Sequence, residues 1–277
     1  MKRKVIKQGH NTLTITLPAK WVDANSVKPG DEVDIEEKGN ALSISRGNGR
    51  FAEVKELDVT KSIIFLEREL YSLYKKGYDE VRITSEDPAL LGRIQKILTD
   101  TVVGFEIVSQ TTKSCIIKNV AEIQDSEFEA VLRRTLLLLN SMAEGVYEAM
   151  KNADINSIPN LRYMEKTNNR YTGFLRRVLN KRGKGDYKNE KLLYGFVEFV
   201  EKIADEYKYL CIFFEEDTKR IQKISKNVLE LHKRTVSLLR SAFELYYKFD
   251  KEKLIKLYNE RKNIIKEVLN LMNKSLN

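Results

Sequence analysis

The sequence predicts a multidomain α+β protein with a β-rich start, a small α/β block and a long all-α segment. Residues Leu13 to Leu17 alternate apolar and polar side chains, as a half-buried strand does. Strand-like and helix-like stretches then alternate up to residue 123, and beyond it apolar residues recur every three or four positions. We therefore expect three domains, at residues 1–47, 53–123 and 124–277.

The composition is that of a globular protein rich in helix. The chain has 277 residues, of which 42% are hydrophobic and 32% charged, with only 4 prolines. Its unbroken apolar runs span a few residues, far fewer than the roughly 20 that cross a bilayer, so we expect no membrane insertion. The N-terminus is charged from Lys2 and enters an alternating pattern at once, so no secretory signal is visible, and we read Cys115 and Cys211 as buried thiols. These features indicate a cytoplasmic protein.

Residues 1–47 predict four short strands and one short helix. The first strand runs from about Lys2 to Gln8, and Pro18 begins a helix that includes Trp21. Two further strands alternate apolar with polar residues on either side of a turn at Gly39. A unit this small buries too little surface to be stable alone. We therefore expect it to share its sheet with a second copy, as a homodimer.

Basic residues gather in the first strand although the net charge of the N-terminal half is balanced. They are Lys2, Arg3, Lys4 and Lys7. Such a stripe can contact the phosphates of nucleic acid. The alternative is that these side chains only keep an edge strand soluble.

The same segment resembles a known DNA-binding family. The run Lys7–Trp21, which contains Leu-Pro-Ala-Lys-Trp, and the run Val27–Val33, which contains Lys-Pro-Gly-Asp, are similar to the SpoVT/AbrB (also MazE) swapped-hairpin domain. The resemblance implies an intertwined dimer that binds double-stranded DNA through the first strand and the loop after it. It implies the following DNA-binding residues: Lys2, Arg3, Lys4, Lys7, His10, Asn11 and Lys20.

Residues 53–123 predict a small α/β domain. We expect a strand near Leu57, a helix capped by Thr60 and ended by Gly77, a strand at 80–84, a helix opened by Asp87-Pro88, and a closing hairpin. No glycine-rich phosphate loop follows a strand. The expected role is mechanical, as a spacer or dimer support, and the alternative is a small-molecule cleft.

Residues 124–277 predict five long helices that stack as a bundle. The third helix has a continuous apolar face with Glu198, Glu201 and Asp205 at its border. Glu201 and Asp205 lie four residues apart, so their carboxylates project from neighbouring turns of one side. Such a pair can hold a hard cation, or it can form a solvated edge.

The helical part resembles the PhoU domain, a helical bundle of phosphate signalling. The matching stretches are Arg133–Ala143, Glu165–Asn169 and Glu201–Asp205. The resemblance implies Glu-x-x-x-Asp pairs that bind clustered iron or another divalent metal. The implied metal ligands are Glu201, Asp205, Glu165 and Asn169, with an amide at Asn169 in place of a carboxylate.

A basic cluster lies toward the end of the second long helix. Its members are Arg176, Arg177, Lys181 and Arg182. One interpretation is a solvated hairpin tip. The others are a site for a phosphate ion or an acidic partner, and an extra contact with the DNA backbone.

The order of the two resemblances is similar to that of archaeal phosphate uptake regulators. It implies a DNA-binding transcriptional regulator whose bundle senses a signal or docks on a phosphate transporter or signalling protein. Two alternatives are a non-DNA-binding PhoU-type adaptor and an antitoxin of the AbrB/MazE type. We expect no enzyme, because Ser, His and Cys are not clustered and no nucleophile–base pair is visible.

Overall fold

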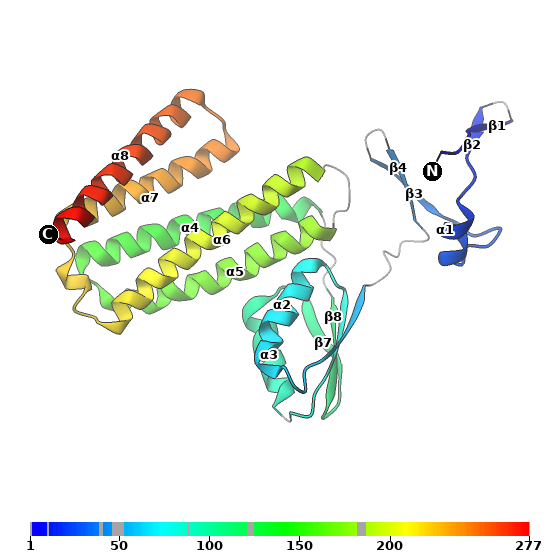
Figure 1. Cartoon of the computed structure of the whole chain (residues 1–277), viewed down its shortest axis with the longest axis horizontal. Helices are drawn as coiled ribbons and strands as arrows, with labels where there is room; N and C mark the ends of the chain where they lie inside the picture. Colours follow the sequence, from blue (N-terminus) through cyan, green and yellow to red (C-terminus); the bar gives the residue numbers. More distant parts are fainter. Residues whose placement is uncertain are drawn as a thin grey trace. The chain divides into compact units, whose positions relative to one another are not determined.

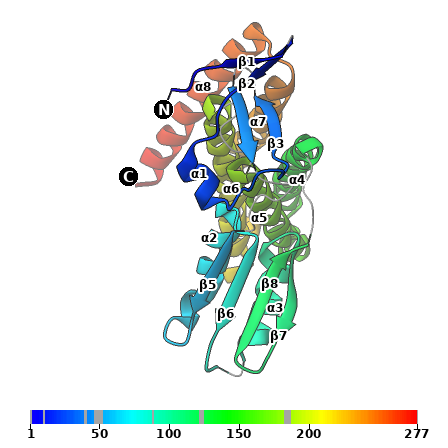
Figure 2. The ribbon, with the colours of Figure 1, turned by 90° about the vertical axis from the view of Figure 1, so that its right-hand side faces the viewer.

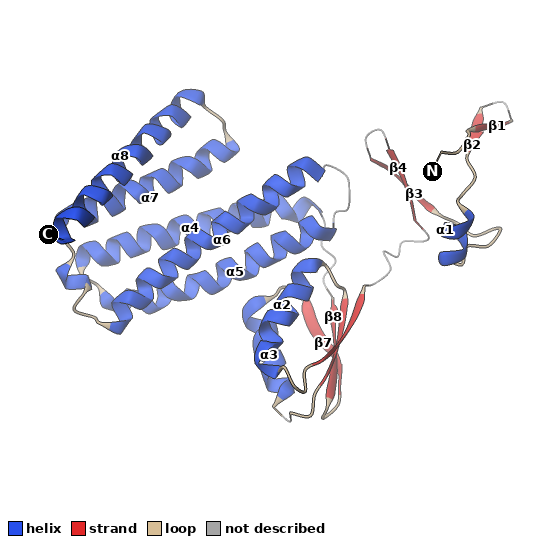
Figure 3. Cartoon of the chain, viewed as in Figure 1, coloured by secondary structure: helices blue, strands red, loops and turns tan. Residues whose placement is uncertain are grey.

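The computed structural model describes residues 2–9, 11–38, 41–45, 53–87, 89–120, 125–181 and 187–276. The chain divides into two compact units, residues 1–52 and residues 53–277, which are drawn in Figures 1 and 3. None of the described helices is both long enough and apolar enough to cross a membrane. Each unit is described by itself below.

The first unit contains the predicted four strands and one helix. Strand β1 (Ile6–Gln8) pairs antiparallel with β2 (Thr12–Thr14), helix α1 (Ala19–Ala24) follows, and β3 (Asp34–Lys38) pairs antiparallel with β4 (Ala41–Ser45). Strand β1 is shorter than expected because residues 2–5 form no strand pairing. The predicted turn at Gly39 lies outside the described residues.

Apolar side chains of this unit remain uncovered. Helix α1 has no buried residue, and Ile6, Leu13, Ile35 and Leu42 are all more than half exposed. The strands form two separate two-stranded sheets. Because an isolated hairpin is at best marginally stable in water, the apolar side chains of this unit require further cover.

The second unit begins with a four-stranded sheet in the order β5-β6-β8-β7. Its strands are β5 (Val54–Asp58), β6 (Glu80–Thr84), β7 (Phe105–Gln110) and β8 (Ser114–Asn119). Strands β5 and β6 are parallel, and the other pairs are antiparallel (Figure 2). Helices α2 (Leu66–Lys76) and α3 (Leu90–Thr101) lie on one face of the sheet (Figure 1). Leu70 and Ile94 belong to the same buried core as Val81, Ile83 and Ile117 of the sheet.

Helix α2 begins later than the sequence predicts. The Asp58 carboxylate accepts a hydrogen bond from the Thr60 N–H at 3.0 Å, and the Val59 N–H donates to Thr84 O at 3.0 Å. These bonds hold the chain in a turn, so Thr60 caps no helix, and a short 3₁₀ helix (Ile63–Phe65) leads into α2. The predicted stop is confirmed, because Gly77 ends α2 with a φ of 99°.

The rest of the second unit consists of five long helices, as predicted. They are α4 (Asp125–Asn152), α5 (Ile158–Lys181), α6 (Tyr187–Glu216), α7 (Lys226–Tyr247) and α8 (Lys251–Leu276). Helices α4, α5 and α6 pack on one another, α7 packs on α4, and α8 packs on α7 (Figure 1). The predicted apolar face of α6 is confirmed, with Val200, Ala204 and Cys211 fully buried. Cys115 is also buried, and both cysteines are free thiols.

Helix α5 connects the α/β block with the helical bundle. The two parts have separate hydrophobic cores, but α5 contacts both α2 and α3. Gly173 of α5 lies against Tyr71 of α2, where an added Cβ would be 2.8 Å from the tyrosine ring. The α/β block and the bundle therefore have two cores within one compact unit.

The contact at Gly173 gives a stability prediction. Gly173→Ala should destabilise the protein by about 1–3 kcal/mol, because the methyl group displaces a packed ring. The matched control is Gly195→Ala on α6, where nothing lies within 4 Å of the added Cβ. That change should stabilise the protein by up to about 1 kcal/mol through helix propensity. Urea unfolding of both variants is the measurement, and an equal effect of the two changes would contradict the tight contact.

Candidate functional site

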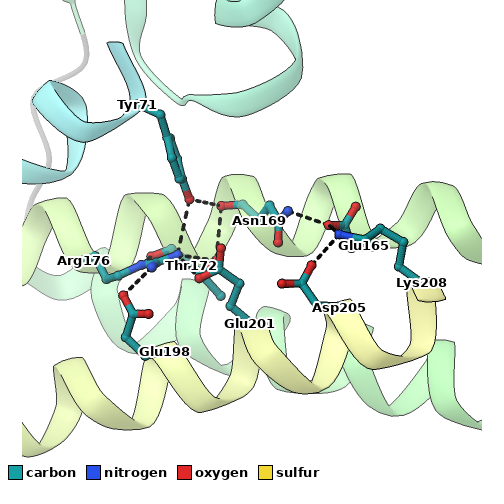
Figure 4. Close-up of polar contacts among 9 residues, drawn as sticks. All are labelled: Tyr71, Glu165, Asn169, Thr172, Arg176, Glu198, Glu201, Asp205 and Lys208. Carbon is teal, nitrogen blue, oxygen red and sulfur yellow. Dashed lines mark hydrogen bonds and ion pairs between the residues drawn. The ribbon is translucent and has the colours of Figure 1, made fainter. Parts of the chain in front are cut away.

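A row of polar and charged residues runs along the face that α5 and α6 share beneath α2 (Figure 4). We call it the charged seam. It comprises Glu165, Asn169, Thr172 and Arg176 of α5, then Glu198, Glu201, Asp205 and Lys208 of α6, and Tyr71 of α2. The α6 members recur at spacings of three and four, so one side of the helix presents them all.

Arg176 dominates one end of the charged seam, and its side chain is only 1% exposed. Its guanidinium donates to the carboxylates of Glu198 and Glu201. Further donor groups reach Thr172 O at 3.2 Å and the Tyr71 hydroxyl at 3.3 Å. Burial lowers the pKa of Arg176, but Tyr71 and the two carboxylates outweigh it, and the net pKa is raised. The guanidinium is therefore a permanent cation.

The carboxyl group of Glu201 is held in a mixed environment. Burial raises its pKa, Arg176 lowers it, Glu198 raises it again, and the net pKa lies above the usual value. Burial also raises the pKa of the Tyr71 phenol. The Tyr71 hydroxyl remains protonated and donates to Asn169 O at 3.2 Å. This end of the seam thus has a fixed cation in contact with four oxygen-bearing side chains, those of Tyr71, Thr172, Glu198 and Glu201.

Lys208 dominates the other end. Its ammonium lies 2.8 Å from Glu165 Oε1 and 2.5 Å from Asp205 Oδ1. The Asn169 amide donates to the same Glu165 oxygen at 2.6 Å. Burial lowers the pKa of Lys208, but the hydrogen bonds to Asp205 and Glu165 outweigh it and raise the pKa to about 12. Lys208 is therefore charged at neutral pH and neutralises a buried carboxylate.

The four residues implied as metal ligands come together in the seam, but they do not fit a metal ion. Glu201 is paired with Arg176, and both Glu165 and Asp205 are paired with Lys208. Asn169 uses its amide group as a donor to Glu165. Within the described parts of the chain, no group of three or more His, Cys, Asp or Glu side chains could hold a metal. Two internal cations occupy the carboxylates that a divalent ion would need.

The interpretations of the basic cluster as a solvated tip and as a site for a phosphate ion, an acidic partner or DNA are wrong for Arg176 and Arg177, which are buried and donate within the protein. Arg177 is fully buried and donates to Tyr74 O at 2.9 Å, Tyr78 O at 2.7 Å and Asp79 Oδ1 at 3.0 Å. Its guanidinium also lies 5.1 Å from the Tyr74 ring centroid and 5.0 Å from that of Phe105. The carbonyl groups where α2 ends provide the acceptors for this cation.

The other members of the basic cluster have different positions. Lys181 is partly buried and pairs with Asp79, and Arg182 lies outside the described residues. Sequence reasoning missed Tyr71, Asp79 and Lys208 as parts of these networks. Lys208 was detectable from its spacing of three from Asp205, whereas nothing local links Tyr71 to α5.

The residues implied as DNA contacts lie on the surface of the first unit. Residues 2–9 are all exposed, so Lys2, Arg3, Lys4 and Lys7 present their charges to solvent. Lys7 is in β1 opposite Leu13 of β2. Asn11 and Lys20 are also exposed, and His10 lies outside the described residues.

Removal of the Lys208 ammonium, which pairs with Glu165 and Asp205, should destabilise the protein to an extent that depends on pH. Lys208→Met should cost about 3 kcal/mol at pH 7, because Glu165, only 5% exposed, loses its buried counter-charge. The pKa of Lys208 is raised in the folded state. The stability that its charge contributes is therefore fully present below about pH 10.5, and so at pH 7.

The deficit of Lys208→Met should persist up to about pH 10.5 and shrink above it, because Lys208 of the wild type then loses its charge. Urea unfolding at several pH values measures it. Lys202→Met on the exposed side of α6 is the control, with an expected change within about 0.5 kcal/mol. A similar small change at Lys208 would contradict the assigned role.

Comparison with known proteins gives one match. Residues 6–45 match the family described as "Antidote-toxin recognition MazE, bacterial antitoxin". No curated protein and no solved structure matches the chain. The matched residues span all four strands and the helix of the first unit. The N-terminal segment of this chain is thus a MazE/AbrB-type antitoxin-like domain, followed by an α/β block and a helical bundle.

Proposed function

We propose that the protein is a DNA-binding transcriptional regulator that acts as a homodimer. The N-terminal domain would bind double-stranded DNA, and residues 53–277 would receive the signal that controls binding. The observation that carries the proposal is a domain of MazE type whose apolar strands remain uncovered in the single chain.

The uncovered apolar residues support the dimer. Leu13 is 70% exposed, and Ile35 and Leu42 are about 60% exposed, although all three lie in strands that alternate apolar with polar residues. Strands of this pattern normally bury the apolar face. A second copy is the partner of matching shape and composition, and joining the two pairs of hairpins would create one larger sheet with a common core.

The charge of the first strand supports the DNA contact. Lys4 and Lys7 are exposed, and Lys2 and Arg3 extend the same stretch. Each lysine or arginine that neutralises a phosphate releases condensed counterions, so affinity falls as salt rises. A dimer doubles the number of these contacts and presents two copies of the basic stretch to one duplex.

The helical part would transmit its signal through the α5 arginines. Arg176 of α5 donates hydrogen bonds to Glu201 of α6 and to Tyr71 of α2. Arg177 donates to the carbonyl groups of Tyr74 and Tyr78. A change in the packing of α5 must therefore move α2 or break these bonds. Because residues 124–277 resemble a PhoU bundle, we propose that the signal concerns phosphate uptake. Mapping of chromosomal binding sites in phosphate-rich and phosphate-poor medium tests this part alone.

The description of the matched family favours an antitoxin as the second candidate. In that case a toxin would bind this chain and the complex would bind DNA. A packed bundle of five helices is an unusual companion for such a role, because antitoxins generally wrap their toxins with a short disordered tail. Co-expression with the product of the adjacent gene, followed by co-purification, separates the two candidates.

Substitution of the strand lysines tests the DNA contact. The double variant Lys4→Ala, Lys7→Ala should weaken binding to all duplex sequences and lower the salt slope by about two for each chain. Gel shifts at two salt concentrations measure both effects. The charge-matched control is Lys219→Ala, Lys223→Ala, in two exposed residues of the second unit. If wild-type protein gives no shift at low salt, the adaptor that binds no DNA becomes the better reading.

A charge in the proposed dimer contact tests the assembly. Leu13→Asp should convert the dimer to monomer, because it would bury an unpaired carboxylate between the subunits. Leu192→Asp on α6 is the matched control, at a leucine that is 73% exposed, and should leave the dimer intact. Analytical ultracentrifugation at micromolar concentration distinguishes the species. A folded wild-type monomer under these conditions would rule out the dimer.

A further inference from the structure

Helices α6, α7 and α8 line an open apolar pocket of about 430 Å³ on the side of α6 that faces away from the charged seam. This volume lies within the range of small-molecule sites, which are mostly apolar. Its lining includes Tyr207, Leu210, His232, Leu239, Ala242 and Leu257.

The inner wall of the pocket carries no charge. Burial lowers the pKa of His232, so the imidazole is neutral at pH 7. Its ring stacks near Tyr147, with centroids 6.4 Å apart, and meets Tyr207 edge-on at 5.8 Å. Burial also raises the pKa of Tyr207 to about 12, so the phenol is neutral as well.

The rim of the pocket has two charged side chains of opposite sign, Glu206 of α6 and Arg261 of α8. Their charges offset each other, so neither an anion nor a cation is favoured at the entrance. A neutral wall within a balanced rim selects an uncharged ligand, because a charged one would lose its hydration without gaining a partner.

We propose that this pocket binds a small, uncharged, apolar molecule with an aromatic or similarly rigid ring. Tyr207 and His232 offer ring faces and edges, and Leu210, Leu239 and Leu257 offer aliphatic surface. The site goes beyond the function proposed above, and binding at it does not require DNA.

The place of the pocket gives such a ligand a structural effect. Helix α8 packs mainly on α7, and Ile264 is its only side chain buried among the residues described. Leu257 of α8 and Leu210 of α6 line the same pocket. A bound ring would contact both and would fasten the α7–α8 hairpin to α6.

Two probes of similar size and shape test the proposal. Equilibrium dialysis of the full-length chain against naphthalene should show saturable binding. Purine, a neutral bicyclic molecule rich in polar nitrogen atoms, should bind at least about tenfold more weakly, because the accessible lining of the pocket is mostly apolar and leaves most of these atoms without a hydrogen-bond partner.

Two variants assign the binding to this pocket. Ala242→Phe should fill the cavity and weaken naphthalene binding at least about tenfold. Ser237→Phe places the same side chain on an exposed position of α7 and should leave binding unchanged. Circular dichroism verifies that both variants are folded. The proposal is overturned if the wild-type protein shows no saturable naphthalene binding, if Ala242→Phe binds as the wild type does, or if purine binds as tightly as naphthalene.

Discussion

The burial of two adjacent guanidinium groups constrains the architecture of the second unit more than any other feature. Arg176 and Arg177 are at most 1% exposed, and a buried cation costs several kcal/mol unless its partners surround it closely. Arg176 finds them on α6 and α2, and Arg177 finds them at the end of α2 and on Asp79. Because the two side chains leave α5 in neighbouring directions, α2, α5 and α6 have to keep one relative position. The two hydrophobic cores are separate, so these polar contacts, together with the packing of Val103 on the bundle core and of Tyr71 on Gly173, specify how the α/β block meets the bundle.

The charged seam illustrates how an internal cation changes the chemistry of a carboxylate pair. The spacing of Glu201 and Asp205 is compatible with metal binding, and the helix does bring both side chains to one face. Whether such a pair can bind a metal ion depends on which side chains face the two carboxylates. Here Lys208 comes from the same helix, and Arg176 comes from α5, so each of the two carboxylates has a cationic partner within the protein. The seam is therefore an element of packing and register.

The sequence allowed prediction of those features that depend on neighbours in the chain. The helix stop at Gly77 and the apolar face around Val200 reflect backbone preference and local periodicity, and the structure has both; the strand predicted at Leu13–Leu17 is present only as Thr12–Thr14, with Leu13 exposed in the single chain. The burial of the arginines was not predictable in this way. Tyr71 and Arg176 are 105 residues apart, and arginine on a helix is normally solvated. The prediction of where α2 starts failed for a related reason. The Val59 N–H bonds to Thr84 O on strand β6 and holds this stretch in a turn.

Helix α6 presents charged side chains on one side and the lining of the apolar pocket on the other. At 100° per residue, Glu198, Glu201 and Asp205 occupy one side, and Ile203, Tyr207 and Leu210 occupy the opposite side. Movement of α6 away from α5 would separate Glu201 from Arg176 and leave a buried cation without its counter-charge. The penalty makes α6 and α5 move together, and Arg177 extends the same constraint to α2. A ligand or partner that displaces α6 from the pocket side would therefore act on the α/β block through the ion pairs and hydrogen bonds of the α5 arginines.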